Sequence, residues 1–284
     1  MRILVFGATG MLGNTLVKYL ISKNNLDVEF TVRNKSRQKL CKEIFNKEAK
    51  YIVEANKPSS ILEAIENFKP NFCINCLGII KQKEEAKDYI KTIQINSLIP
   101  HLIADYCKRY NSQLIHISTD CIFSGKKGNY LDTDDPDPID LYGRSKLLGE
   151  VSNANATTIR TSIIGPEISS ENGLFEWFRN QEGLIYGYKN AWFSGFTTIE
   201  LSRIIYKLII QRKIKNDIYN LSSHPINKYE LLQLINKAYG LNKEIIGDDS
   251  VKINRTLNCD KFSRETGFIK DKWENMIIRM RDFD

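Results

Sequence analysis

The chain has 284 residues, which suits one large α/β domain or a parallel-sheet domain with a smaller cap. Hydrophobic residues make up 42% of the sequence, enough for a sizeable core. No apolar run approaches the roughly 18 residues that a spanning helix needs, so we expect no membrane span. The formal charge of +7 fits a lysine-rich surface or a small polyanionic ligand. Nucleic acid is not expected as a partner, because no basic run interleaves with aromatic residues.

The N-terminus passes from Met1 straight into a short apolar run and a glycine motif, without the longer apolar stretch of a signal peptide. We therefore expect a cytoplasmic protein. Among the six cysteines only Cys73 and Cys76 have ligand-like spacing, and they lie in what reads as a buried strand. A single CxxC is a weak zinc signal, so we expect reduced thiols and no metal site.

Apolar runs alternate with segments of helical periodicity along the first half of the chain. This alternation predicts parallel βαβ units in a doubly wound sheet. Ser59 or Ser60 is expected to cap the helix that runs to Phe68. The expected strands are 2–6, 28–32, 51–53, 72–77, 114–117 and 157–164. The expected helices are 11–21, 36–47, 87–110 and 141–152, with a further helix that opens within 57–60 and has its apolar residues at 61–68.

The alternation loosens after about residue 165. We expect a larger domain over 1–165 and a smaller α/β part over 166–284 that mainly binds the substrate and is interleaved with the first. Thr198 is expected to cap a helix that begins at 199. The later strands are expected at 184–188 and 217–221, and the later helices at 199–211, 228–238 and 272–281.

A glycine motif with GxxGxxG spacing lies between the first expected strand and the first expected helix. Glycines allow the backbone to approach a pyrophosphate, and the helix N-terminus offers free N–H groups to it. The motif therefore predicts a Rossmann fold that binds a dinucleotide. The expected cofactor contacts are Gly7, Thr9, Gly10, Met11, Leu12 and Gly13.

The end of the second expected strand distinguishes between the two nicotinamide cofactors. NAD enzymes usually place an acidic residue there, which accepts a hydrogen bond from the ribose 2′-hydroxyl. Residues 31–37 contain no acid and three cations, Arg33, Lys35 and Arg37. A guanidinium can pair bidentately with a 2′-phosphate, so we expect NADPH, with NADH as the alternative.

Two polar motifs follow further along the chain. Tyr142 and Lys146 are four residues apart, so on a helix they share a face. We expect the ammonium of Lys146 to lower the pKa of Tyr142, which then gives a proton to a carbonyl oxygen as hydride arrives from the cofactor. Thr119 lies at a strand end, where open α/β sheets bind ligands, and its hydroxyl is expected to hydrogen-bond the same carbonyl.

The order of these motifs resembles the dTDP-4-dehydrorhamnose reductase family of extended short-chain dehydrogenases. The resemblance is carried by the glycine loop, the Ile-Ser-Thr-Asp sequence at 117–120, a phenylalanine-glycine loop, and Tyr-Gly-x-Ser-Lys-x-x-Gly-Glu at 142–150. It covers residues 1–165 well and continues weakly through 254–262 and 266–268. The resemblance implies NADPH-dependent reduction of a nucleotide-linked 4-keto-6-deoxysugar, in a pathway that supplies deoxysugars for surface polysaccharide.

The same resemblance implies roles for individual residues. Thr119, Tyr142 and Lys146 are the implied catalytic residues. The oligomeric state is left open, with a homodimer as one possibility. Asn96 matches a family asparagine that supports the active site. Beside the residues already named, the expected cofactor contacts are Leu77, Gly78, Asn96, Tyr142 and Lys146, and the expected substrate contacts are Asp120, Cys121 and Trp192.

Two departures from the family pattern leave the sugar and the nucleotide open. An Arg-Pro pair commonly precedes the C-terminal segment, whereas Val251 and Lys252 are found here. An aromatic residue often follows Arg-Thr-Ser, whereas Ile163 follows it in this chain. Some family members use magnesium, but no residues here have convincing ligand spacing.

Three other activities on this fold are weighed against plain reduction. Sugar-nucleotide dehydratases have a glutamate where this chain has Cys121. GDP-fucose synthases have a cysteine there and a downstream histidine, which together epimerise the sugar; His101, His116 and His224 do not match that histidine well. The family also includes a non-catalytic, NADP-binding regulatory subunit of a methionine adenosyltransferase. Plain reduction is favoured, with the epimerase-reductase and the regulatory subunit as alternatives.

Overall fold

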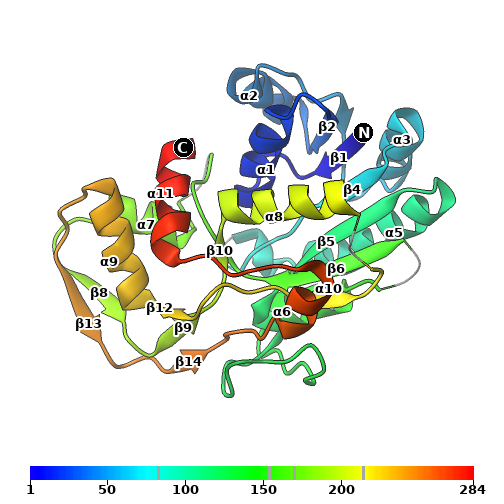
Figure 1. Ribbon diagram of the computed structural model, residues 1–284. Helices are drawn as coiled ribbons and strands as arrows, with labels where there is room; N and C mark the ends of the chain where they lie inside the picture. Colours follow the sequence, from blue (N-terminus) through cyan, green and yellow to red (C-terminus); the bar gives the residue numbers. More distant parts are fainter. Residues whose placement is uncertain (82–83, 153–154, 169–170, 213–214) are drawn as a thin grey trace.

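The computed structural model describes residues 1–81, 84–152, 155–168, 171–212 and 215–284 (Figure 1). Within these residues the centre is a seven-stranded sheet in the order β11-β6-β5-β4-β1-β2-β3, with every neighbouring pair parallel. The strands are β1 (Arg2–Phe6), β2 (Asp27–Val32), β3 (Tyr51–Ile52), β4 (Phe72–Asn75), β5 (Gln113–Thr119), β6 (Ala156–Thr161) and β11 (Ile218–Asn220).

The strand order reverses between β1 and β4. In the register of this pair Phe6 lies opposite Asn75, and Asn75 lies opposite His116 of β5. The carboxyl ends of β1, β4 and β5 therefore meet at one edge of the sheet. Open α/β sheets bind their ligands at such a reversal point, so this edge of the sheet is the candidate ligand site.

Helices cover both faces of this sheet, which confirms the predicted doubly wound architecture. Along β1, Ile3 and Val5 pack into one core cluster while Leu4 and Phe6 pack into the other, as the period of two in a strand requires. One face carries α1 (Met11–Ile21), α2 (Lys35–Phe45) and α8 (Thr198–Gln211), and the other carries α3 (Ser59–Phe68), α5 (Ile99–Arg109) and α6 (Leu141–Leu148).

The helix expected over roughly 87–110 is confirmed from Tyr89 to Arg109, but it contains one irregular turn. The structure has a short turn, η1 (Glu84–Lys87), then α4 (Tyr89–Ile93), a wide π-helical turn η2 (Gln94–Leu98), and then α5. Pro100 explains where the regular helix is interrupted, because it has no N–H to donate to the carbonyl four residues earlier. The interruption widens the helix at the point where it faces α6.

Both predicted helix caps are also wrong. Pro58, with no side-chain cap bond, precedes α3, and the Ser60 hydroxyl instead donates to the carbonyl of Lys57. Thr197 caps α8 by accepting from the N–H of Glu200. The Thr198 hydroxyl does not cap, because it is engaged by Thr15 of α1 at 3.0 Å.

Several element ends differ from expectation, among them the ends of three elements around the site. The fourth strand ends at Asn75 instead of 77, because the Asn75 side chain accepts from the N–H of Leu77 and turns the chain. The sixth strand stops at Thr161, and the carbonyl of Ser162 accepts from Phe196 in another sheet. The catalytic-motif helix ends at Leu148 instead of 152.

The residues after 165 form a smaller lobe (left in Figure 1) and also return to the larger one. α8 packs against α1, and β11 extends the central sheet, so the two parts are interleaved. The remaining elements are η3 (Asp120–Ile122), β7 (Ile163–Ile164), α7 (Leu174–Asn180), β8 (Ile185–Tyr188), β9 (Ala191–Phe193), β10 (Phe196–Thr197), β12 (Ile226–Asn227), α9 (Lys228–Tyr239), β13 (Ile245–Asp248), β14 (Ile253–Asn254), α10 (Asp260–Thr266) and α11 (Trp273–Phe283).

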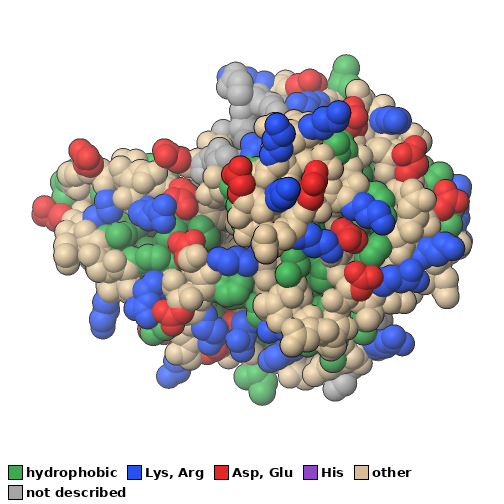
Figure 2. All heavy atoms as spheres, turned by 90° about the horizontal axis from the view of Figure 1, so that it is seen from above, with side chains coloured by type: hydrophobic (Ala, Val, Ile, Leu, Met, Phe, Trp, Pro, Cys, Tyr) green, Lys and Arg blue, Asp and Glu red, His purple; other side chains and the backbone are tan. Residues whose placement is uncertain are grey.

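The surface seen in Figure 2 carries positive and negative side chains interspersed, without one continuous basic patch on that face. Within the described part of the chain, no helix is both long enough and apolar enough to cross a membrane.

Candidate active site

The glycine motif forms a tight turn between β1 and α1. Gly7 has φ +86°, in the region that disfavours residues with a Cβ. A Cβ on Gly13 would lie 2.1 Å from the carbonyl oxygen of Gly7, so only glycine allows α1 to approach the turn this closely. Gly10 precedes the first residue of α1, and the N–H groups of the first helical turn are oriented outward at this end. The turn has the backbone geometry of a pyrophosphate site.

The basic loop after β2 lies next to this turn. The N–H of Ala8 donates to the carbonyl of Thr31 at 3.2 Å, which ties the ends of β1 and β2 together. Asn34 caps α2 by accepting from the N–H of Arg37 at 3.0 Å. Arg33 and Lys35 are exposed on either side of this cap, and Arg37 is half-buried. The three predicted cations therefore cluster around one helix N-terminus beside the glycine turn.

The loop after β4 closes the other side of the turn. A Cβ on Gly7 would lie 3.1 Å from the Leu77 side chain, so the two segments are in direct contact. Asn96 fixes the following residues, since its Oδ1 accepts from the N–H of Ile79 at 2.8 Å and its Nδ2 donates to the Ile79 carbonyl at 3.0 Å. The same amide nitrogen donates to the Ser145 hydroxyl of α6 at 3.0 Å. Asn96 thus joins the loop after β4 to α6.

The wide turn η2 shapes this junction. Because Pro100 cannot donate to it, the carbonyl of Asn96 is open to approach from α6. A Cβ on Gly149 would lie 2.0 Å from that carbonyl oxygen, so α6 ends against it at a distance that only glycine permits. The end of α6 at Leu148 and the π-helical turn before α5 therefore both belong to this one contact.

The helix α6 holds the Tyr-Lys pair against the end of β5. Asp140 begins the helix by accepting from the N–H of Gly143 at 2.8 Å. The ammonium of Lys146 donates to the carbonyl of Ile117 at 2.7 Å, and this side chain is 3% exposed. Thr119, the last residue of β5, is hydrogen-bonded to the hydroxyl of Tyr142. The structure brings together the three residues expected to be catalytic.

The expected lowering of the Tyr142 pKa by Lys146 is wrong. Burial raises the pKa of the Tyr142 hydroxyl, Cys121 and Asp120 raise it further, and only the hydrogen bond with Thr119 lowers it. The ammonium of Lys146 is held by a backbone carbonyl of β5 instead of by the phenol. Tyr142 is therefore protonated at neutral pH, which is the state in which it can donate a proton.

Burial also acts on Lys146. It lowers the pKa of the ammonium to about 8, while the negative charge of Glu150 and, to a smaller extent, Cys76 oppose that change. The burial that raises the pKa of Tyr142 thus lowers that of Lys146, since the charged form of each is disfavoured.

Asp120 and Cys121 follow Thr119 in the short turn η3. Asp120 is 6% exposed, and burial raises its pKa although Arg255 and Lys228 oppose that shift. Burial and the charge of Asp120 raise the pKa of the Cys121 thiol to about 12, so Cys121 is neutral at neutral pH.

Lys228 and Arg255 are two residues of this site that the sequence analysis missed. Both follow strands that flank β9, and their charges act on Asp120 and Cys121. Arg255 Nε donates to the carbonyl of Phe123 at 2.9 Å, which places it just beyond η3. One sequence signal was present, because Lys228 is the first residue of a helix, where the helix dipole disfavours a cation.

Lys228 is held in place without a carboxylate partner. Its ammonium lies 4.0 Å from the centroid of the Phe193 ring, and no hydrogen bond or salt bridge joins it to another described residue. Burial lowers its pKa to about 8, while Asp120 and Cys121 oppose that change. A cation with unused donors at the edge of a site can bind an anionic ligand group.

Trp192 lies in the middle strand of the same small sheet, opposite Asn227 and Asn254. Successive side chains of a strand point to opposite faces, so Trp192 points away from the face where Phe193 lies under Lys228. Its side chain is 36% exposed.

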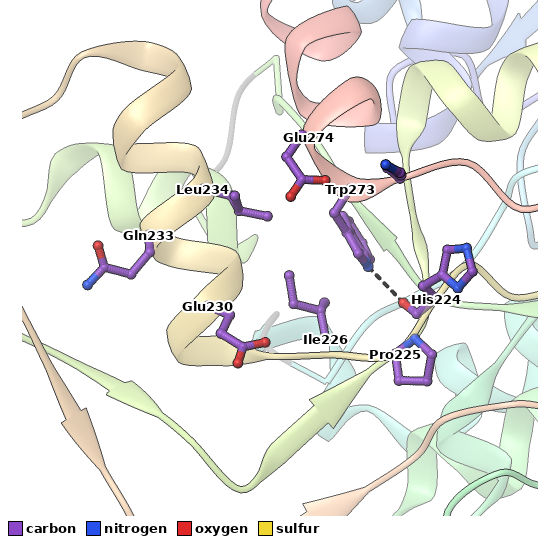
Figure 3. A pocket seen from close by; sticks show the side chains of 9 residues that line it. His224, Pro225, Ile226, Glu230, Gln233, Leu234, Trp273 and Glu274 are labelled. Carbon is purple, nitrogen blue, oxygen red and sulfur yellow. Dashed lines mark hydrogen bonds between the residues drawn. The ribbon is translucent and has the colours of Figure 1, made fainter.

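A cavity of about 440 Å³ lies between β12, α9 and the start of α11 (Figure 3). Ile226, Leu234 and Trp273 line its apolar part, and Glu230 lies at its edge. The indole of Trp273 donates to the carbonyl of His224 at 2.7 Å. Thr119, Tyr142 and Lys146 do not line this cavity, so it is separate from the site at the sheet edge. Among the described residues no three His, Cys, Asp or Glu side chains are grouped to hold a metal ion.

Solved structures share the fold of this protein over almost the whole chain. dTDP-4-dehydrorhamnose reductase from Bacillus anthracis, crystallised with NADP, aligns with a TM-score of 0.79 at 19% identity and covers 99% of this chain and 98% of that one. At this identity the likeness shows the fold. The Rossmann sheet, the glycine turn and the Tyr-Lys pair beside a strand-end threonine define the class, which is the NAD(P)-dependent oxidoreductases of the short-chain dehydrogenase type.

Sequence comparisons assign the chain within this class. Residues 1–176 match the family model described as the RmlD substrate binding domain. dTDP-4-dehydrorhamnose reductase of Aggregatibacter actinomycetemcomitans is 26% identical over 240 residues, which are 79% of this chain and 74% of the relative. Methionine adenosyltransferase 2 subunit beta of Danio rerio is 31% identical over 196 residues, 64% of this chain and 54% of the relative. The chain belongs to the RmlD family, which confirms the resemblance found in its sequence.

Proposed function

We propose that the protein reduces the 4-keto group of a nucleotide-linked 4-keto-6-deoxysugar with NADPH, the reaction implied by the name of its dTDP-4-dehydrorhamnose reductase relatives. The observation that carries the proposal is the contact of Thr119, Tyr142 and Lys146 at the carboxyl end of β5, at the same sheet edge as the glycine turn. A bound NADPH would supply the hydride.

The residues of the chain would then perform the proton transfer. Tyr142 is protonated at neutral pH and would donate its proton to the carbonyl oxygen of the sugar. Thr119, which is hydrogen-bonded to Tyr142, would bind the same oxygen. Lys146, whose ammonium is bound to the carbonyl of Ile117, would place a positive charge beside the cofactor.

NADPH is preferred over NADH in this proposal because of the loop after β2. Arg33, Lys35 and Arg37 surround a helix N-terminus, and no acidic residue is present to accept from a ribose 2′-hydroxyl. A 2′-phosphate would meet both the cations and the positive end of the helix dipole. The glycine turn, Leu77, Gly78 and Asn96 would border the rest of the cofactor.

The substrate would lie between η3 and the smaller lobe. Lys228 and Arg255 would bind the diphosphate, since both place cations opposite the strand end. Asp120 and Cys121 would border the sugar. Trp192 remains a predicted substrate contact, on the other face of its sheet from Phe193.

A non-catalytic role is the second candidate, because relatives named methionine adenosyltransferase 2 subunit beta are as similar as the reductases. The intact Thr119, Tyr142 and Lys146 contacts favour catalysis. An epimerase-reductase would need an ionisable group on each face of the sugar, and Cys121 is neutral with its pKa at about 12.

The test is to follow NADPH absorbance with a panel of nucleotide-linked 4-keto-6-deoxysugars. Oxidation with one panel member supports the proposal and identifies the substrate. NADPH binding without turnover of any member, together with a stable complex with a methionine adenosyltransferase, would favour the regulatory subunit.

A further inference from the structure

Three successive residues of β5 each bind a different part of the α6 segment. The carbonyl of Ile117 accepts from the ammonium of Lys146 at 2.7 Å. The hydroxyl of Ser118 donates to Oε1 of Glu150 at 2.8 Å. Thr119 is hydrogen-bonded to Tyr142. Two of these attachments hold the residues proposed for catalysis, whereas the middle one holds a carboxylate to which the proposed reaction gives no role.

The carboxylate of Glu150 is also bound by the neighbouring strand. Arg160 lies opposite Ser118 in the β5–β6 register. Its Nε donates to both carboxylate oxygens at 2.9 and 3.1 Å, and its Nη2 donates to Oε2 at 2.7 Å. The side chains are 6% and 3% exposed, for Arg160 and Glu150 respectively. Such a bidentate, buried pair fixes both direction and distance.

We propose that Glu150 is a positioning residue of the reduction, whose anchored carboxylate keeps α6 aligned with β5 and keeps the neighbouring Lys146 positively charged. The proposal rests on the proposed function, because it concerns the same Tyr-Lys pair. Glu150 touches neither the expected substrate nor the expected cofactor, and it acts through Lys146 and Tyr142.

The charges around Lys146 support this role for Glu150. His116 on β5 and Cys76 after β4 also face Lys146, and Tyr142 lies one turn before it on α6. Burial lowers the pKa of His116 and raises those of Cys76 and Tyr142, so these three groups are neutral at neutral pH. Of these neighbours, Glu150 alone supplies a negative charge that opposes the deprotonation of Lys146.

A contribution to folding stability does not by itself explain the ion pair between Glu150 and Arg160. Burying two charges costs desolvation, and replacing a buried pair by neutral groups of similar size is often neutral or stabilising. Removing only one partner lowers stability, because the remaining charge is then buried without a counter-charge. A structural role and a positioning role can therefore be separated by comparing a single variant with a double one.

The experiment uses Glu150→Gln, the double variant Glu150→Gln/Arg160→Met, and the control Glu200→Gln, which removes the carboxylate of another ion pair with an arginine, Arg279. The pKa of Lys146 is measured by NMR titration of labelled lysine side chains, with the signal assigned by its loss in Lys146→Met. Melting temperature and the pH dependence of NADPH oxidation are measured on the same proteins.

We expect the Lys146 pKa to fall in both Glu150 variants, by on the order of one unit, and to stay unchanged in the control. The melting temperature should fall in the single variant and recover in the double one, while kcat stays about ten-fold low in both. A melting temperature that falls with an unchanged Lys146 pKa, or a double variant with full kcat, would overturn the inference. The NMR titration needs no turnover, so a wild type that reduces no sugar contradicts the proposed function alone.

Discussion

Lys146 lies one helical turn after Tyr142, yet its ammonium donates to the carbonyl of Ile117 on β5, at 2.7 Å, instead of to the phenol. The lysine is thereby attached to the strand that ends in Thr119. The tyrosine, lysine and threonine proposed for catalysis form a unit because helix and strand are bound to each other at three successive residues of β5.

The first prediction concerns pH. Burial lowers the pKa of Lys146 to about 8. The side chain is therefore positively charged below that pH and loses its charge as the pH rises through 8. We expect kcat to be steady near neutral pH and to fall above about 8. The pKa of Lys228 is also lowered to about 8, so the profile is repeated with Lys228→Met. A fall in kcat that disappears in that variant would assign the titration to Lys228 and contradict this account.

The second prediction concerns Lys228 as a diphosphate ligand. Lys228→Met should weaken the binding of a nucleoside diphosphate by about ten-fold, measured by calorimetry with dTDP, UDP and GDP, while leaving the nucleosides unaffected. The melting temperature should stay level or rise, because a buried cation is removed from a helix N-terminus. Lys237→Met, which removes a charge from the last turn of the same helix, is the control. Unchanged diphosphate affinity would exclude this role.

The third prediction concerns cofactor choice. Replacing Arg33 and Arg37 together by alanine should raise KM for NADPH by about 10²–10⁴-fold, because each of the two charged hydrogen bonds to a phosphate contributes roughly 1.5–3 kcal/mol. KM for NADH should change little, so the preference for NADPH over NADH should fall. Steady-state kinetics with both cofactors measures this ratio, and an equal loss with NADH would show that the arginines do not recognise the 2′-phosphate.

The fourth prediction concerns the glycine turn. Gly13→Ala places a Cβ 2.1 Å from the Gly7 oxygen, so the turn must shift and the free energy of unfolding should fall by about 1–3 kcal/mol. At Gly10 a new Cβ would lie 3.5 Å from the carbonyl oxygen of Gly7, an ordinary contact distance, so Gly10→Ala should leave the protein as stable as wild type. Thermal unfolding of the two variants gives the comparison, and equal melting temperatures would show that the close approach of α1 is not required.

The order of strands and helices in the larger lobe could be predicted from the sequence because its signals are local. The apolar residues of β1 are sorted to the two faces of the sheet by a period of two, and the glycine motif lies directly at the end of that strand. The two incorrect caps show the limit of local signals. Thr197 and Thr198 are adjacent and chemically identical, and the contact of Thr198 with Thr15 on another helix decides which of them caps.

The parts that could not be predicted depend on distant contacts. Pro100 is visible in the sequence, but the π-helical turn before it is not, and neither is the close approach of Gly149 to the Asn96 carbonyl. Lys228 and Arg255 reach the site only through the pairing of β12 and β14 with β9, which no periodicity specifies. The pKa of Tyr142 was predicted with the wrong sign, because burial was not foreseen to outweigh a neighbouring charge.

The most direct measurement of the central claim is the rate of NADPH oxidation by wild type and by Tyr142→Phe, with the best nucleotide-linked 4-keto-6-deoxysugar of the panel. Removing the proton donor should lower kcat by about 10²–10⁴-fold while NADPH still binds, because general acid catalysis contributes on that order. A Tyr142→Phe protein that binds NADPH and reduces the sugar at the wild-type rate would contradict the claim that Tyr142 supplies the proton.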